Sequence, residues 1–263
     1  MIYANCRAST LGGLRYASRV TWKADRPDEH VATDLTGKRV VVLVHGVKNT
    51  TAQIENAYRE IFNRNRAAYD VAVGFIYPGG VSPFAWPVVS LEAVDEAAYH
   101  LSEVLATVQK LHPLSIDIDA HSLGCPIALE ALCERENTKI DGLWLMAPAM
   151  GRDLSDYREL LVVDPHLLTG PQIRYDIHVF RSRRDPVLAF LYRIWPLKFG
   201  RAALGAAGES SKGGNIAIAH DCPAEVGMNH TGYRRSNIVV QAHTNEAIRR
   251  ARAAGVPFSE KPT

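Results

Sequence analysis

The stretch LSIDIDAHSLGCPIALEALCER (Leu114–Arg135) passes from an alternating apolar run, through a serine, into a run with helical spacing. Ala120 and Gly124 stand two positions before and two after Ser122. A sharp strand-to-helix turn needs such small flanks, because it brings the neighbouring strand and helix too close for larger side chains. Ala120 replaces the more usual glycine and adds only a methyl group. The stretch therefore predicts a nucleophile elbow that presents the Ser122 hydroxyl.

Strand-like and helix-like segments alternate through most of the chain. Strands are expected over 37–46, 69–80, 114–122, 142–149, 174–182 and 215–222. Helices are expected over 50–62, 88–111, 124–135 and 236–254, with a further helix start at Asp185-Pro186. Strands that alternate with helices predict a mostly parallel central sheet with helices on both faces.

One α/β domain is expected over residues 37–256, because nothing in this range marks a linker between separate cores. Residues 1–36 form an N-terminal extension with a candidate edge strand at RYASRVTWK (Arg15–Lys23), and residues 257–263 form a tail. A cap-like excursion, irregular or partly helical, is expected near residues 150–173.

Bulk composition excludes several classes of protein. The 263 residues are 47% hydrophobic, which argues against disorder, and the net charge of +2 is too small to predict a nucleic-acid partner. The first twenty residues have no sustained apolar run, so no secretory signal is expected, and no apolar run is long enough for a membrane span to be expected. The four cysteines, Cys6, Cys125, Cys133 and Cys222, have no C-x-x-C spacing and are expected to be reduced. A cytoplasmic protein is predicted, with no prediction of its oligomeric state.

A second element of a hydrolytic site follows the buried strand GKRVVVLVHG (Gly37–Gly46). At His45-Gly46 the chain must turn away, so that a backbone N–H can face the serine. The amides of Val47 and Leu123 are the expected oxyanion donors. An ordinary strand-to-helix turn, with glycine for conformational freedom, would also account for His45-Gly46.

A serine hydroxyl needs a base, and the base needs a carboxylate to orient it. In this chain order the acid should follow the elbow, and the histidine should come last. Asp185, after the strand 174–182, is the favoured acid. Its alternative roles are a helix N-cap and a salt bridge to Arg181, Arg183 or Arg184, and capping does not exclude catalysis. Asp153 is the main competitor.

Three late histidines are candidate bases. His230 lies on a loop after the last strand and just before the final helix, where a base can reach the serine. His220 ends the preceding strand and could point into the core or the sheet edge. His243 lies inside the final helical pattern and is expected to be a surface or packing residue. His230 is therefore favoured.

With these motifs in place, the chain resembles the α/β-hydrolases of the serine esterase and lipase type. The resemblance covers roughly residues 37–254 and rests on VHG-x-x-N (Val44–Asn49) and AHS-x-G (Ala120–Gly124). An H-x-x-Y pattern near the end is matched by His230 and Tyr233.

Three positions depart from the pattern of the group with these motifs. Its members have a Trp-Pro-Ser segment where this chain has Tyr77 and Gly79, and they often have aspartate at the position of Ala149.

The resemblance implies a serine hydrolase that cleaves a small-molecule carboxylic ester or thioester through an acyl-enzyme. Ser122 would attack, His230 would move the proton, and Asp185 would orient the imidazole. No cofactor is implied, and the histidines show no H-x-H or H-E-x-x-H pattern for a metal. Two alternatives stay open: a non-catalytic binding module on the same fold, and an acyltransferase that uses the same triad.

Overall fold

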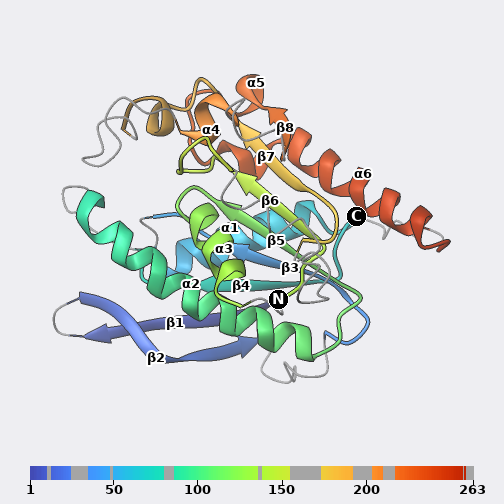
Figure 1. Ribbon diagram of the computed structural model, residues 1–263, viewed down its shortest axis with the longest axis horizontal. Helices are drawn as coiled ribbons and strands as arrows, with labels where there is room; N and C mark the ends of the chain where they lie inside the picture. The colour runs from blue at the N-terminus through green and yellow to red at the C-terminus, as the bar shows by residue number, and fades with distance from the viewer. Residues whose placement is uncertain are drawn as a thin grey trace, which may run out of the picture.

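Eight strands form one sheet in the computed structural model of the chain, in the order β2-β1-β4-β3-β5-β6-β7-β8 (Figure 1). The structure describes residues 1–10, 13–24, 35–47, 50–79, 86–135, 138–154, 173–191, 203–209, 217–256 and 258.

All neighbouring strands from β1 to β8 pair in parallel, and only the edge strand β2 runs antiparallel to its neighbour. The strands are β1 (Ile2–Thr10), β2 (Gly13–Ala24), β3 (Arg39–Val44), β4 (Val71–Ile76), β5 (Ser115–His121), β6 (Gly142–Met146), β7 (Ile177–Arg181) and β8 (Ala217–Asp221). The predicted mostly parallel sheet is confirmed. β1 had not been predicted, and the candidate edge strand Arg15–Lys23 falls within β2.

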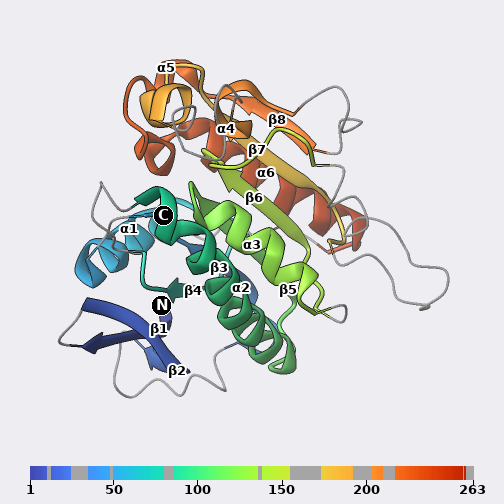
Figure 2. The ribbon, with the colours of Figure 1, turned by 60° about the vertical axis from the view of Figure 1, so that its left-hand side comes forward.

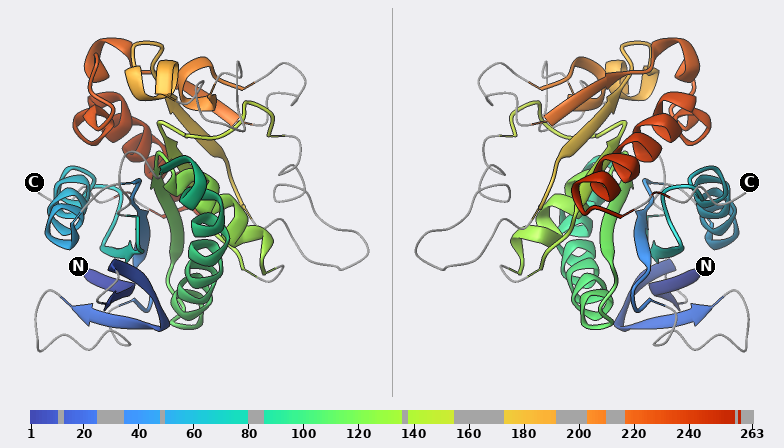
Figure 3. Two further views of the ribbon diagram at one scale, coloured as in Figure 1. Left: turned by 90° about the vertical axis from the view of Figure 1, so that its left-hand side faces the viewer. Right: turned by 90° about the vertical axis from the view of Figure 1, so that its right-hand side faces the viewer.

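Helices cover both faces of the sheet (Figures 2 and 3). The long helix α2 (Trp86–Lys110) packs with α3 (Gly124–Cys133) on one face, whereas α1 (Thr51–Arg64) and α6 (Asn237–Ala253) lie on the other. Two short helices, α4 (Leu204–Ala207) and α5 (Pro223–Val226), lie near the carboxyl ends of β7 and β8. The η2 π-helix (Val187–Leu191) and the η4 3-10 helix (Gly232–Arg235) complete the described elements.

Local sequence accounts for the central elements. In β3, RVVVLV, five of the six residues are buried, because helices cover the strand on both sides. α1 begins with a capping box, in which the Thr50 side chain accepts from the Gln53 N–H and the Gln53 side chain accepts from the Thr50 N–H. Ser236 caps α6 in a similar way, accepting from the Val239 N–H.

Parts of the predicted domain division lie outside the described residues. Of the cap-like excursion expected near 150–173, residues 155–172 are not described, and of the tail 257–263 only residue 258 is. Within the described ranges, no helix is both long and apolar enough to cross a lipid bilayer.

Candidate active site

Ser122 occupies a sharp turn between β5 and α3, at the carboxyl end of the strand. Its φ of 56° lies in the left-handed region that side chains other than glycine rarely adopt. Three backbone hydrogen bonds hold the strained turn in place. The Ser122 N–H donates to the Met146 carbonyl at 2.9 Å, and the Ser122 carbonyl accepts from Cys125 at 3.1 Å and from Ala149 at 3.2 Å.

Close packing around this turn explains its small flanks. A Cβ placed on Gly124 would lie 2.6 Å from the His45 carbonyl oxygen and 2.7 Å from that of Val44, which leaves no room for a side chain. Ala120 is fully buried in β5, between the neighbouring strands β3 and β6. The spacing seen in the sequence is therefore a steric requirement of the fold.

His230 lies on the loop between α5 and η4, and its two ring nitrogens reach Ser122 and Asp185. Nε2 is 2.9 Å from Ser122 Oγ, and Nδ1 is 2.7 Å from Asp185 Oδ2. Since an ionised carboxylate can only accept, Nδ1 carries the proton. The Nε2 lone pair then faces the serine hydroxyl, which is the arrangement that a general base requires.

Asp185 both caps a helix and binds His230. Its Oδ1 accepts from the N–H groups of Val187 at 3.0 Å and Leu188 at 3.3 Å, and its Oδ2 accepts from His230. The carboxylate has no exposed surface. The helix cap and the bond to His230 thus use different oxygens of the same side chain.

The neighbouring arginines and the competing acid differ from Asp185 in their exposure or in their ion-pair partner. Arg181 pairs with Asp221 at 2.7 Å, and Arg183 and Arg184 are exposed. Asp153, the competing acid, is also exposed.

The other two candidate bases contribute to the packing of the sheet. His220 stacks on Phe180 with ring centroids 4.5 Å apart, and His243 on α6 bonds the Tyr69 hydroxyl through Nδ1 at 2.8 Å. His243 also lies against Trp144, at 3.9 Å between ring centroids. Neither histidine has a hydrogen bond to Ser122 in the described part of the chain.

His121 has a role that the sequence did not reveal. Its Nε2 donates to the backbone carbonyl of His230 at 2.9 Å, which connects the loop that carries His230 to the turn at Ser122. Burial lowers the pKa of His121 well below its ordinary value, so the ring is neutral at pH 7.

One expected oxyanion donor, Leu123, directly follows Ser122 in the chain, and the other, Val47, follows Gly46. Gly46 packs directly against Ser122, because a Cβ on Gly46 would lie 2.9 Å from Ser122 Cβ. Leu123 is the residue that precedes the first turn of α3. Among the described residues, its N–H has no hydrogen-bond partner.

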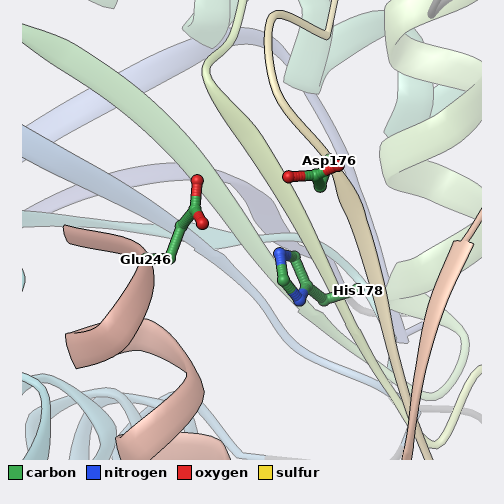
Figure 4. A group of neighbouring side chains, drawn as sticks. All are labelled: Asp176, His178 and Glu246. Carbon is green, nitrogen blue, oxygen red and sulfur yellow. The ribbon is translucent and has the colours of Figure 1, made fainter. Parts of the chain in front are cut away.

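Asp176, His178 and Glu246 form the one cluster with metal-ligating side chains found among the described residues (Figure 4). Their ligand atoms lie within 4.8 Å of one another. However, Arg249 bonds both carboxylates, at 2.6 Å to Glu246 and 2.9 Å to Asp176, and Arg250 bonds Glu246 at 2.8 Å. The carboxylate charge is already balanced by two guanidinium groups, so we interpret the cluster as an ion-pair network. It lies at the amino end of β7, at the opposite end of the sheet from Ser122.

Two buried histidines should make the fold sensitive to acid. Burial lowers the pKa of both His45 and His178 to about 3, whereas unfolding returns them to about 6.5. Between these values the unfolded chain binds protons that the native chain does not, so stability is lost as the pH falls below about 6.5. At pH 5 each histidine should cost about 2 kcal/mol relative to pH 7.

Urea unfolding at pH 7 and pH 5 measures this loss. His178→Gln should remove about 2 kcal/mol of the difference, which is the share of His178 alone, because His45 and other buried histidines such as His121 are still protonated on unfolding. Equal unfolding free energies at the two pH values would contradict the prediction.

A scan against protein families matches residues 23–242 to a family described as "Alpha/beta hydrolase of unknown function (DUF900)". No curated protein is significantly similar to the chain in sequence.

Several solved structures are similar in fold. A lipase of Bacillus licheniformis, BlEst2, is 12% identical, with 86% of this chain and 95% of the lipase covered and a TM-score of 0.49. XC6422 of Xanthomonas campestris, described as an α/β serine hydrolase without lid, is 12% identical, with coverages of 96% and 94% and a TM-score of 0.44. An uncharacterized protein of Bacillus cereus is 14% identical at a TM-score of 0.44, and the match spans 76% of this chain but only 55% of the other.

Proposed function

The chain belongs to the DUF900 family of α/β-hydrolases, and on that premise we propose that it is a serine hydrolase that cleaves a carboxylic ester or thioester through an acyl-enzyme. One observation carries the proposal: the unbroken relay from Asp185 through His230 to Ser122, with distances of 2.7 Å and 2.9 Å. A relay of this kind activates a hydroxyl that would otherwise be a poor nucleophile.

The reaction proceeds in two halves. Ser122 Oγ attacks the carbonyl carbon while its proton passes to His230 Nε2, and Asp185 stabilises the resulting imidazolium. As the tetrahedral intermediate collapses, His230 returns that proton to the departing alcohol or thiol. Water then gives a proton to His230 and attacks the acyl-serine. As this second intermediate collapses, His230 returns the proton to Ser122 Oγ, and the carboxylic acid is released.

The amides of Val47 and Leu123 are the proposed donors to the oxyanion. Two features support them: the contact of Gly46 with Ser122, and the Leu123 N–H, which has no partner within the described ranges. Donors aimed at the developing charge lower the barrier by several kcal/mol, because they need no reorganisation during the reaction.

The alternative of a non-catalytic binding module predicts a base or acid directed away from the serine, and the two short distances count against it. We also propose a cytoplasmic location. It is supported by the four cysteines, none of which forms a disulfide in the described part of the chain, because disulfides are rare in the reducing cytosol.

Labelling with a small fluorophosphonate, read by intact mass, tests the proposal. One adduct per wild-type chain, absent from Ser122→Ala, is expected, because only an activated serine displaces the fluoride. Esters of increasing acyl length, with and without an added alcohol acceptor, would then define the substrate and separate hydrolysis from acyl transfer. A folded wild-type protein that gains no adduct would favour the binding module.

A further inference from the structure

His45, at the end of β3, has every hydrogen-bonding group occupied by a fixed partner. Its backbone N–H donates to Tyr58 Oη at 2.9 Å, and its backbone carbonyl accepts from Tyr77 Oη at 2.8 Å. Its ring nitrogens bond the Tyr77 N–H at 3.2 Å and the Gly46 carbonyl at 2.6 Å. We call His45, Tyr58 and Tyr77 the His45 cage.

Hydrogen-bond chemistry determines the tautomer of His45. Because the Tyr77 N–H can only donate, Nε2 of His45 must accept, and the ring proton is on Nδ1. Nδ1 therefore donates to the Gly46 carbonyl. The deep burial that lowers the pKa of His45 to about 3 keeps this neutral form at all ordinary pH values.

This bond orients the peptide that follows Gly46. In a trans peptide the carbonyl and the next N–H point in opposite directions. The chain has no cis peptide bond among its described residues. With the Gly46 carbonyl directed at the His45 ring, the Val47 N–H points away from that ring.

The two tyrosines are held as firmly as the histidine. The Tyr77 ring stacks on His45 at 4.1 Å between centroids and 10° between planes, and Tyr58 Oη donates to the Phe75 carbonyl at 2.5 Å. Gly74 makes room for Tyr58, since a Cβ there would lie 2.5 Å from its ring. Gly79 makes room for the turn, since a Cβ there would lie 3.1 Å from the Gly46 carbonyl oxygen.

Tyr77 and Gly79 are two of the residues that depart from the group the sequence resembles, and both lie against the same turn. We propose that Tyr58 and Tyr77 are positioning residues, which clamp His45 and thereby aim the Val47 N–H for use as an oxyanion donor. This inference rests on the proposed function and adds to it two residues that do not touch the substrate.

Removal of a single hydroxyl tests the role. Tyr77→Phe and Tyr58→Phe keep the rings but lose the bonds to the backbone of His45. Each should lower kcat about 10- to 100-fold, with KM within about twofold, because a misaimed donor weakens only the transition state. Affinity for a boronic acid, which mimics the tetrahedral intermediate, should fall in proportion.

Tyr69→Phe is the matched control. Tyr69 is also buried, and Tyr69→Phe loses two hydrogen bonds, to Asp117 at 2.7 Å and His243 at 2.8 Å, as Tyr58→Phe does, but Tyr69 precedes β4 at the other end of the sheet. It should lose stability and keep kcat. Wild-type kcat in Tyr77→Phe, or an equal loss in Tyr69→Phe, would overturn the positioning role.

A turnover-independent measurement separates this inference from the proposed function. Histidine ¹⁵N NMR should find His45 as the Nδ1–H tautomer, and an Nε2–H tautomer would overturn the cage. A wild type with neither fluorophosphonate adduct nor turnover would instead overturn the proposed function, and with it the oxyanion role.

Discussion

Ser122→Ala should lower kcat for an activated ester by about 10⁴- to 10⁶-fold, because it removes the atom that forms the acyl-enzyme. The residual rate would come from the oxyanion donors and from substrate binding alone. Steady-state hydrolysis of a p-nitrophenyl ester, with wild type and variant prepared identically, measures the effect. The variant should still bind the ester, since the hydroxyl contributes mainly after binding.

A matched control separates chemistry from folding. Ser102 is also buried, and its hydroxyl donates to the Tyr99 carbonyl at 2.7 Å within α2, so Ser102→Ala loses one hydrogen bond away from the site. It should retain turnover. If Ser122→Ala kept wild-type hydrolysis, the assignment of the nucleophile would be wrong.

Asp185→Asn is expected to lower kcat about 10⁴-fold while leaving the fold nearly unchanged. The asparagine oxygen can still accept from the Val187 and Leu188 N–H groups, so the helix cap survives. Its amide, however, would donate to His230 Nδ1 and move the ring proton to Nε2. The base would then present a proton, instead of a lone pair, to Ser122.

Asp185→Ala gives the complementary result. It removes the cap as well, which should cost about 0.5–2 kcal/mol of unfolding free energy beyond the asparagine variant. Comparison of kcat with urea stability across the two variants separates the two functions of the carboxylate. An asparagine variant with full activity would restrict Asp185 to capping and reopen the choice of the acid.

Much of the fold could be predicted because its signals are local. The β-branched run in β3, the alternation in β5 and the Thr50 cap of α1 each act within a few residues of chain. The strand β1 was missed, because its place in the sheet depends on pairing with β4, about 70 positions further along the chain. No local pattern reports such a partner.

The elbow could also be predicted from the sequence, because the need for small residues on either side of Ser122 is a property of one turn. The sequence could not decide in the same way among His220, His230 and His243. All three side chains have the same chemistry, and only the path of the chain between them and the elbow decides which one lies 2.9 Å from the hydroxyl.

The sequence by itself therefore determined the mostly parallel α/β architecture, and it predicted the elbow and the order in which the proposed acid and base follow it. Only the tertiary structure decided that Asp185 bonds a helix start and His230 at once, that His121 bonds the His230 carbonyl, and that Tyr58 and Tyr77 bond the backbone of His45. The physical reason is the separation along the chain over which each kind of interaction acts. Steric and conformational preferences act between neighbours in the chain, whereas hydrogen bonds join any two groups that folding brings within about 3 Å.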